Sequence, residues 1–111
     1  MTYRSQVFVN RILPAFRTLV SRELSDNYGL TQEEIASALD TSQAMVSNYL
    51  SPGESDLAER LSEDPQTQVL VEDAASKAAN GDDFVEELLD LLSQIQDRSI
   101  VPGFSEADRV L

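Results

Sequence analysis

The feature that most constrains the fold of this chain is the helical spacing of its apolar side chains. In the first part of the chain, apolar residues recur at nearly every fourth position, which is the period of an amphipathic α-helix. These positions are Phe8, Ile12, Phe16, Val20, Leu24 and Tyr28. Pro14 lies inside this stretch and lacks a backbone N–H, so we expect a kink or two abutting helices there. Because no segment alternates apolar and polar residues as a strand does, the sequence predicts an all-α fold.

Helix-capping residues divide the following part of the chain into short helices. Gly29 is expected to end the first helix in a left-handed conformation. Thr31 and Glu34 have the spacing of a capping box and predict the start of a short helix. The segment Asp40-Thr41-Ser42 should interrupt that helix, and a further helix is expected from about residue 43 to residue 50.

The remaining helices are predicted in the same way. We expect a short helix at about 56–62, then a longer one that Asp64-Pro65 begins and Gly81 ends. Asp83 and Glu86 have the spacing of another capping pair, ahead of a last helix that extends to about Ile95. The sequence therefore predicts a five- or six-helix bundle over residues 1–98, with a helix-turn-helix at about 31–50. Residues 99–111 have no clear periodicity and are expected to form a loose tail.

Two residue types that carry much of protein chemistry are absent, because the chain has no cysteine and no histidine. This excludes a disulfide framework, a thiolate nucleophile and the commonest general base and transition-metal ligand. No apolar run approaches the roughly 20 residues of a membrane span, and the first residues do not resemble a signal peptide. We therefore expect a cytoplasmic binding protein without cofactor, metal or enzymatic activity.

The acidic residues are concentrated in the second half of the chain. The net charge is −12, yet residues 1–50 carry four arginines against five acids, whereas residues 51–111 carry four basic against fifteen acidic residues. One interpretation is an acidic region that binds a basic partner. The other, which we favour, is adaptation to a high-salt cytoplasm, where a Debye length of roughly 3 Å screens the self-repulsion.

A row of carboxylates in the last part of the chain has its own two interpretations. Asp82, Glu86 and Asp90 are four residues apart and would lie on one helix face, where carboxylates can bind Ca²⁺ or Mg²⁺. No binding loop with alternating ligands accompanies them, so a solvated helix face is the favoured interpretation.

The most informative segment is residues 30–50. A helix-turn-helix needs a small residue where its two helices approach closely, and Ala36 meets that need. It also needs short polar side chains on the outer face of its second helix, which enters a major groove about 12 Å wide. The residues expected to contact bases are Gln43, Ala44, Ser47 and Asn48, with Ser42 beside them at the helix start. Glutamine and asparagine amides can pair with adenine N6 and N7, and an alanine methyl group can contact the thymine methyl group.

Leu30-Thr31-Gln32-Glu33-Glu34-Ile35-Ala36, followed by Ser42-Gln43-Ala44-Met45-Val46-Ser47-Asn48-Tyr49-Leu50, resembles the XRE (phage-repressor-like) helix-turn-helix family. Further points of similarity are Ile12-Leu13-Pro14-Ala15-Phe16-Arg17, Tyr28-Gly29-Leu30-Thr31-Gln32, and the helical stretches around Asp64-Pro65 and Asn80-Gly81-Asp82. Through them, residues 4–98 look like small archaeal regulators whose helix-turn-helix part is elsewhere fused to a thiamine-phosphate synthase domain.

The resemblance implies a transcription regulator that binds double-stranded DNA. It implies backbone contacts by Gln32, with Ser42 and Arg17 as further candidates. The chain departs from the family pattern in the turn, where Asp40 replaces a glycine and Thr41 replaces an apolar residue. Aspartate tolerates a left-handed conformation, so we expect the turn to persist.

Two alternatives for this segment remain open. Short helix-turn-helix units also occur as plain structural corners, and as protein-interaction modules such as coactivators or antitoxin-like partner binders. The arginines of the first part of the chain also have two interpretations. They can contact phosphates, or they can be ordinary surface charge and form intramolecular pairs such as Arg22 with Asp26. These arginines are Arg4, Arg11, Arg17 and Arg22.

The last predicted helix has two adjacent apolar seams, which is more than one contact line needs. One seam can close the core of the domain, and the other can form a homodimer, since repressor-like modules usually bind paired half-sites. The predicted dimer residues are Leu88, Leu89, Leu92 and Ile95. The alternative is a wholly intramolecular core helix.

Overall fold

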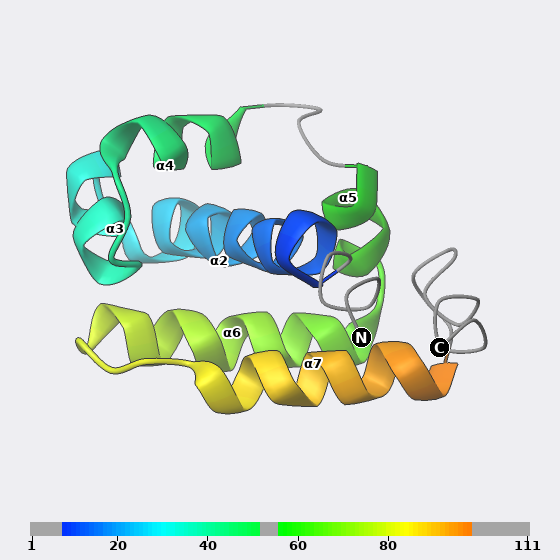
Figure 1. Cartoon of the computed structure of the whole chain (residues 1–111). Helices are drawn as coiled ribbons and strands as arrows, with labels where there is room; N and C mark the ends of the chain where they lie inside the picture. The colour runs from blue at the N-terminus through cyan, green and yellow to red at the C-terminus, as the bar shows by residue number, and fades with distance from the viewer. Residues whose placement is uncertain (1–7, 52–55, 99–111) are drawn as a thin grey trace.

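The chain folds into an all-α bundle, as the sequence predicts. A computed structural model describes residues 8–51 and 56–98 (Figure 1), and these ranges contain a π-helical turn, six α-helices and no strand. The elements are η1 (Phe8–Ile12), α2 (Leu13–Tyr28), α3 (Gln32–Ala38), α4 (Gln43–Leu50), α5 (Asp56–Ser62), α6 (Pro65–Ala79) and α7 (Val85–Arg98). The predicted tail over residues 99–111 lies outside the described residues. None of the described helices combines the length and the apolar character needed to cross a membrane.

The predicted interruption at Pro14 is confirmed. The π-helical turn η1 leads directly into α2, and Pro14 occupies the first turn of α2. Proline is tolerated in the first turn of an α-helix, and because it has no N–H to donate to a carbonyl of η1, it accounts for the change of helix type at this point. At the other end, Gly29 has the predicted left-handed conformation (φ 67°), and its N–H donates to the carbonyl of Leu24.

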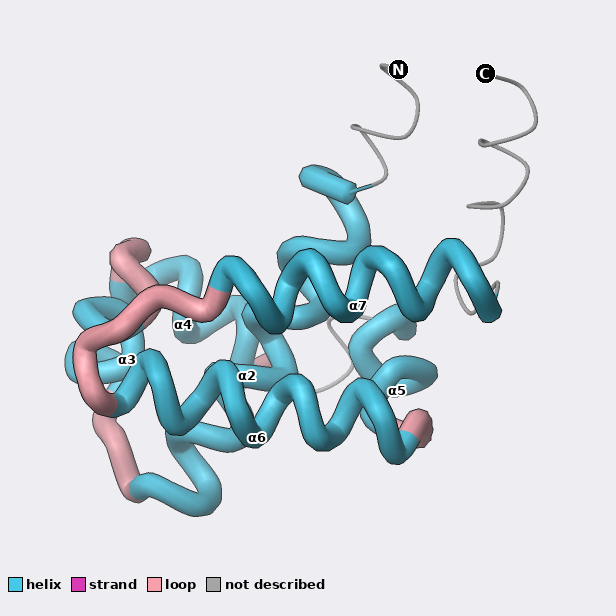
Figure 2. The backbone as a smooth tube through the Cα atoms, turned by 90° about the horizontal axis from the view of Figure 1, so that it is seen from below, coloured by secondary structure: helices cyan, strands magenta, loops and turns pink. Residues whose placement is uncertain are grey.

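α2 is the centre of the bundle and contacts α3, α4, α5 and α6. The α3–α4 unit covers one side of α2, and the antiparallel pair α6–α7 covers the other side (Figure 1). Viewed from below, α6 and α7 lie side by side, with α5 near one end of α6 (Figure 2). The core runs through both layers, and its largest fully buried side chains include Phe16, Leu24, Ile35, Leu61, Leu91 and Ile95.

The ends of α6 form as the sequence predicts. The Asp64 carboxylate accepts hydrogen bonds from the Thr67 N–H (2.9 Å) and the Thr67 hydroxyl (2.8 Å), and proline follows at the first helical position. At the C-terminal end, Gly81 adopts φ 84° and the Asp82 N–H donates to the carbonyl of Lys77 at 2.8 Å. This is a Schellman ending, which needs a left-handed residue.

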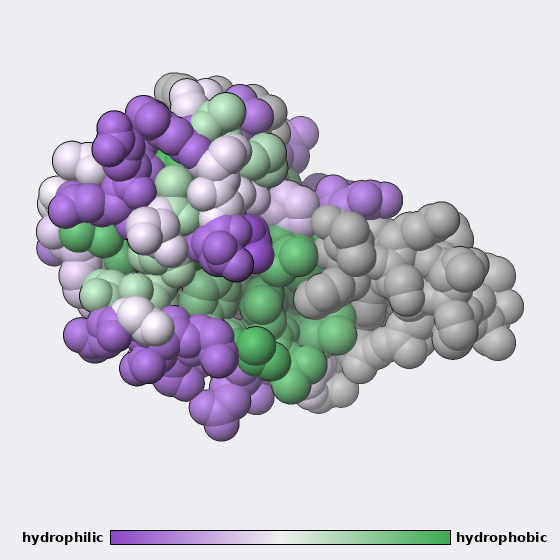
Figure 3. All heavy atoms as spheres, turned by 60° about the vertical axis from the view of Figure 1, so that its left-hand side comes forward, coloured by the Kyte–Doolittle hydropathy of each residue, from purple (hydrophilic) through white to green (hydrophobic). Residues whose placement is uncertain are grey.

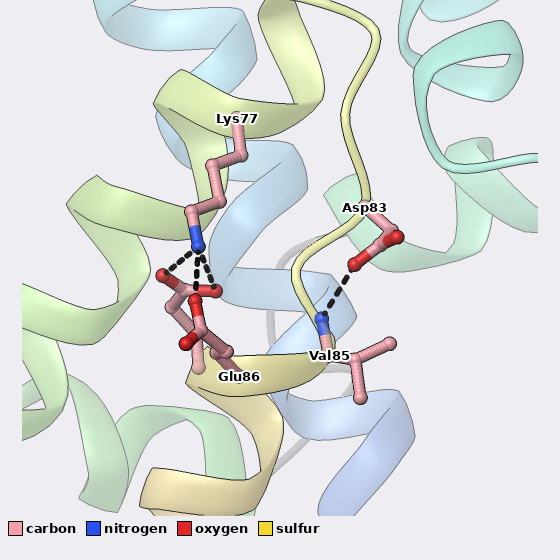
Figure 4. Close-up of polar contacts among 5 residues, drawn as sticks. Lys77, Asp83, Val85 and Glu86 are labelled. Carbon is pink, nitrogen blue, oxygen red and sulfur yellow. Dashed lines mark hydrogen bonds and ion pairs between the residues drawn. The ribbon is translucent and has the colours of Figure 1, made fainter.

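The only lysine in the chain, Lys77 of α6, pairs with two glutamates in the first turn of α7, across the loop that joins these helices (Figure 4). Lys77 Nζ lies 2.9 Å from Glu87 Oε2 and 3.0 Å from Glu86 Oε1, and the Glu87 side chain is only 8% exposed. Hydrogen bonds to Glu87 and Glu86 raise the pKa of Lys77 above its usual value. The predicted capping pair is therefore wrong for Glu86, because the lysine binds its carboxylate. Asp83 retains part of the predicted role and accepts from the Val85 N–H at 3.3 Å.

Candidate nucleic-acid interface

The first helix of the helix-turn-helix begins at the predicted capping box. The Thr31 hydroxyl accepts from the Glu34 N–H at 3.1 Å, and Glu34 Oε1 accepts from the Thr31 N–H at 2.8 Å. These reciprocal bonds satisfy two donors at the start of α3. Ile35 and Ala36 are buried as expected, and Ala36 lets α3 and α4 approach closely. Gln32, the predicted phosphate contact, is half-buried at the first position of α3.

The turn after α3 contains Asp40 and Thr41, the two residues at which the sequence departs from the family pattern. Asp40 is the only non-glycine residue with positive φ in the described part of the chain (φ 54°). The Thr41 N–H donates to the carbonyl of Ala36 at 2.9 Å, and the Asp40 N–H donates to that of Ser37 at 3.3 Å. These two bonds form a Schellman motif with Asp40 at its left-handed position. The expectation that aspartate can replace glycine here is confirmed.

α4 has the predicted bounds, Gln43–Leu50. The Ser42 hydroxyl caps it by accepting from the Met45 N–H at 3.1 Å. Val46 and Tyr49 are buried on the inner face, where α4 packs against α2 and α3. The role of Ser42 as a phosphate contact stays a prediction, and its hydroxyl also has this structural role.

The outer face of α4 brings the predicted base-contacting residues together. All four are exposed and lie one turn apart in two neighbouring rows: Gln43, Ala44, Ser47 and Asn48. No residue of α4 is charged. Figure 1 places α4 on the side of α2 opposite to α6 and α7. The helix that would enter a groove thus lies away from the acids of α6 and α7, and its neighbour α3 carries two exposed glutamates, Glu33 and Glu34.

Sequence reasoning missed Met45 near this face, and it named Arg11 only among the arginines that can contact phosphates. Met45 is exposed beside the four predicted contacts. Its position next to Ala44 in the predicted helix could have indicated this exposure. Arg11 is exposed and lines the same hollow as Asn48, a proximity that only the fold reveals.

The arginines of α2 have different environments. Arg17 is half-buried, and its Nε is enclosed without a hydrogen-bond partner in the described part of the structure. Its contact with a phosphate stays a prediction. Arg22 forms an ion pair with Glu59 of α5 at 2.9 Å, rather than the expected pair with Asp26. The pair with Glu59 forms because α2 and α5 pack against each other.

Between α4, the η1–α2 junction and α5 lies a hollow of about 390 Å³. Its polar lining includes Asn10, Arg11, Asn48 and Asp56, and its apolar lining includes Pro14, Met45 and Leu57. Thr18 and Tyr49 also line it. Two segments that are distant in the sequence, residues 10–18 and 45–57, supply these residues, so no local motif indicates the hollow.

The predicted dimer surface on α7 is partly corrected by burial. Leu89 is 59% exposed, and Leu88 and Leu92 are half-buried. Ile95 is fully buried in the core of its own chain, so its assignment to a dimer surface is wrong. Val85, which is 54% exposed, extends the outward seam instead. Figure 3 shows apolar surface on the α6–α7 side of the molecule, bordered by strongly polar side chains.

The predicted carboxylate row does not lie on one helix face, because Asp82 is in the loop before α7 and only Glu86 and Asp90 belong to the helix. Asp82, Glu86 and Asp90 are exposed, and Glu86 binds Lys77. Within residues 8–51 and 56–98, no three acidic, histidine or cysteine side chains gather as metal ligands would.

Comparison with known proteins adds no family to this description. No protein-family model matches the chain, and no curated protein and no solved structure matches it either.

Proposed function

We propose that this chain is a sequence-specific regulator of transcription that binds double-stranded DNA through α4. The observation that carries the proposal is the outer face of α4, where short, uncharged side chains are exposed together on a helix whose other face is fixed by Val46 and Tyr49. The proposed base contacts are Gln43, Ala44, Ser47 and Asn48, with backbone contacts by Gln32, Ser42 and Arg17. A capped helix of this kind holds its amide groups in the fixed directions that pairing with adenine requires. The XRE-like motif supports the same function.

The charge distribution is compatible with DNA binding in strong salt. DNA that approaches along α4 meets an uncharged helix, whereas most acids belong to the second half of the chain. We propose that the protein works in a high-salt cytoplasm, where the repulsion between its acids and the phosphates is screened over roughly 3 Å.

We further propose that the regulator is a homodimer that joins through the outward seam of α7, formed by Val85, Leu88, Leu89 and Leu92. Apolar side chains exposed in a row on a helix are a surface that a second copy can cover. The same seam favours a second candidate function, a protein-interaction module without base readout. In that case α7 would bind a different protein and α4 would bind no DNA.

Selection of bound sites from random duplex DNA in strong KCl tests the proposal. A defined, enriched sequence is expected. Gln43→Ala and Asn48→Ala should each weaken binding of that sequence by about 5- to 150-fold, which corresponds to about 1–3 kcal/mol for a lost base contact. Gln66→Ala, at an exposed glutamine of α6, is the matched control and should change nothing. No enriched sequence, with both α4 variants equal to the control, would favour the interaction module.

A further inference from the structure

We propose that the hollow between α4, the η1–α2 junction and α5 binds a free amino acid with an apolar side chain. Its volume of about 390 Å³ is in the range of small-ligand sites, which are typically apolar with a few convergent polar groups. Its walls combine an apolar part with a larger number of polar side chains. Met45, Leu57 and Pro14 supply apolar surface, and Tyr49 and two asparagines supply hydrogen-bonding groups.

The charges on the lining select the class of ligand. Arg11 stands on the η1 side of the hollow and Asp56 begins α5 on another side. Both residues are exposed, and neither side chain forms an ion pair or hydrogen bond with another side chain in the described residues. A guanidinium is suited to a carboxylate and an aspartate is suited to an ammonium group. One ligand that carries both groups satisfies both residues.

The net charge of the protein favours the same class of ligand, one that carries both a carboxylate and an ammonium group. A chain of net charge −12 repels free anions, and a purely cationic ligand would face Arg11. An amino acid has no net charge near neutral pH and avoids both penalties. Its side chain would contact the apolar wall formed by Met45, Pro14 and Leu57.

The position of Asn48 links the hollow to α4. Asn48 lines the hollow and also belongs to the proposed base-contacting face. An amino acid bound there would compete with DNA for this amide, a consequence that rests on the proposed function. Linkage requires that the amino acid lowers DNA affinity by the same factor as DNA lowers amino acid affinity.

Titration of the ¹⁵N-labelled chain with L-phenylalanine, followed by NMR in the absence of DNA, tests the site by itself. We expect saturable shifts at the amides of Thr18, Asn48 and Leu57 below about 10 mM, which covers sites with a Kd of about 1 mM or tighter. 2-Phenylethylamine lacks the carboxylate, and 3-phenylpropanoate lacks the ammonium group. Each of these analogues should bind at least about tenfold more weakly.

Matched variants complete the experiment. Arg11→Gln and Asp56→Asn alter exposed side chains and should fold normally, and each should weaken phenylalanine binding about tenfold. Arg60→Gln and Asp73→Asn, at exposed residues outside the hollow, should leave it unchanged. Absence of shifts, equal binding of either analogue, or equal losses in the control variants would overturn the site. If phenylalanine binds and the selected DNA is bound equally well with and without it, the competition is refuted while the DNA-binding proposal stands.

Discussion

The left-handed turn at Asp40 offers a stability test of the helix-turn-helix geometry. A left-handed conformation costs an ordinary L-residue about 1–2 kcal/mol, and aspartate and asparagine reduce that cost through local hydrogen bonds of their short side chains. Asp40→Ala keeps the Cβ and removes the polar group. At φ 54° it should destabilise the fold by about 1 kcal/mol, or about 4 °C in Tm for a domain of this size.

Two further substitutions separate the backbone effect from the charge. Asp40→Asn keeps the tolerance for positive φ and should leave Tm nearly unchanged. Asp40→Gly removes the strain but adds about 0.5–1 kcal/mol of backbone entropy to the unfolded chain, so its net effect should also be small. The expected order of stability is therefore Asn and Gly near the parent, with Ala clearly below them.

Thermal and urea unfolding of the three variants, followed by circular dichroism, supplies the measurement. Ser37→Ala, at an exposed residue of α3 just before the turn, is the control for the effect of an alanine on local helix propensity. If Asp40→Ala is as stable as the parent, residue 40 is not left-handed and the described turn between α3 and α4 is incorrect.

Three other predictions follow from the charges and from α7. Leu89→Glu should convert a dimer to a monomer in sedimentation with an unchanged helical spectrum, whereas Val69→Glu, at an exposed valine of α6, should not; a parent chain that sediments as a monomer would refute the dimer. Raising KCl from about 0.1 to 3 M should raise Tm, since the screening length falls from about 10 Å to below 3 Å; a constant Tm would favour the basic-partner interpretation of the acids. Because its partners raise the pKa of Lys77, the stabilisation by that ion pair should be complete below the ordinary lysine pKa of about 10.4 and decline as pH rises above it. Lys77→Met should abolish this decline, and a decline that persists in the variant would assign it to other groups.

The elements of the fold could be predicted because their signals are local. Capping hydroxyls and carboxylates lie within three residues of the N–H groups they bind, so Thr31, Ser42 and Asp64 mark helix starts in the sequence itself. The bounds of α4 follow from such signals, and so does the exposed set that begins at Gln43. A helical period also indicates which residues share a face.

The rest depends on which elements the fold brings together. Periodicity reveals two apolar seams on α7 and does not say which one meets the core, so Ile95 was predicted on the wrong surface. Glu86 has the spacing of a cap, but its partner Lys77 is brought close by the turn at Gly81. Arg22 pairs with a residue 37 positions away, and the hollow beside α4 is likewise formed by distant segments.

The most direct test of base readout by α4 is a double-mutant cycle between protein and DNA. The selected duplex is prepared with each adenine replaced in turn by 7-deazaadenine, which removes the major-groove acceptor N7. At one position the parent protein should lose about 5- to 150-fold in affinity, whereas Gln43→Ala, which already lacks that contact, should lose almost nothing further. Losses that are the same for the parent and the variant at every adenine, or no loss at any adenine, would contradict readout by α4.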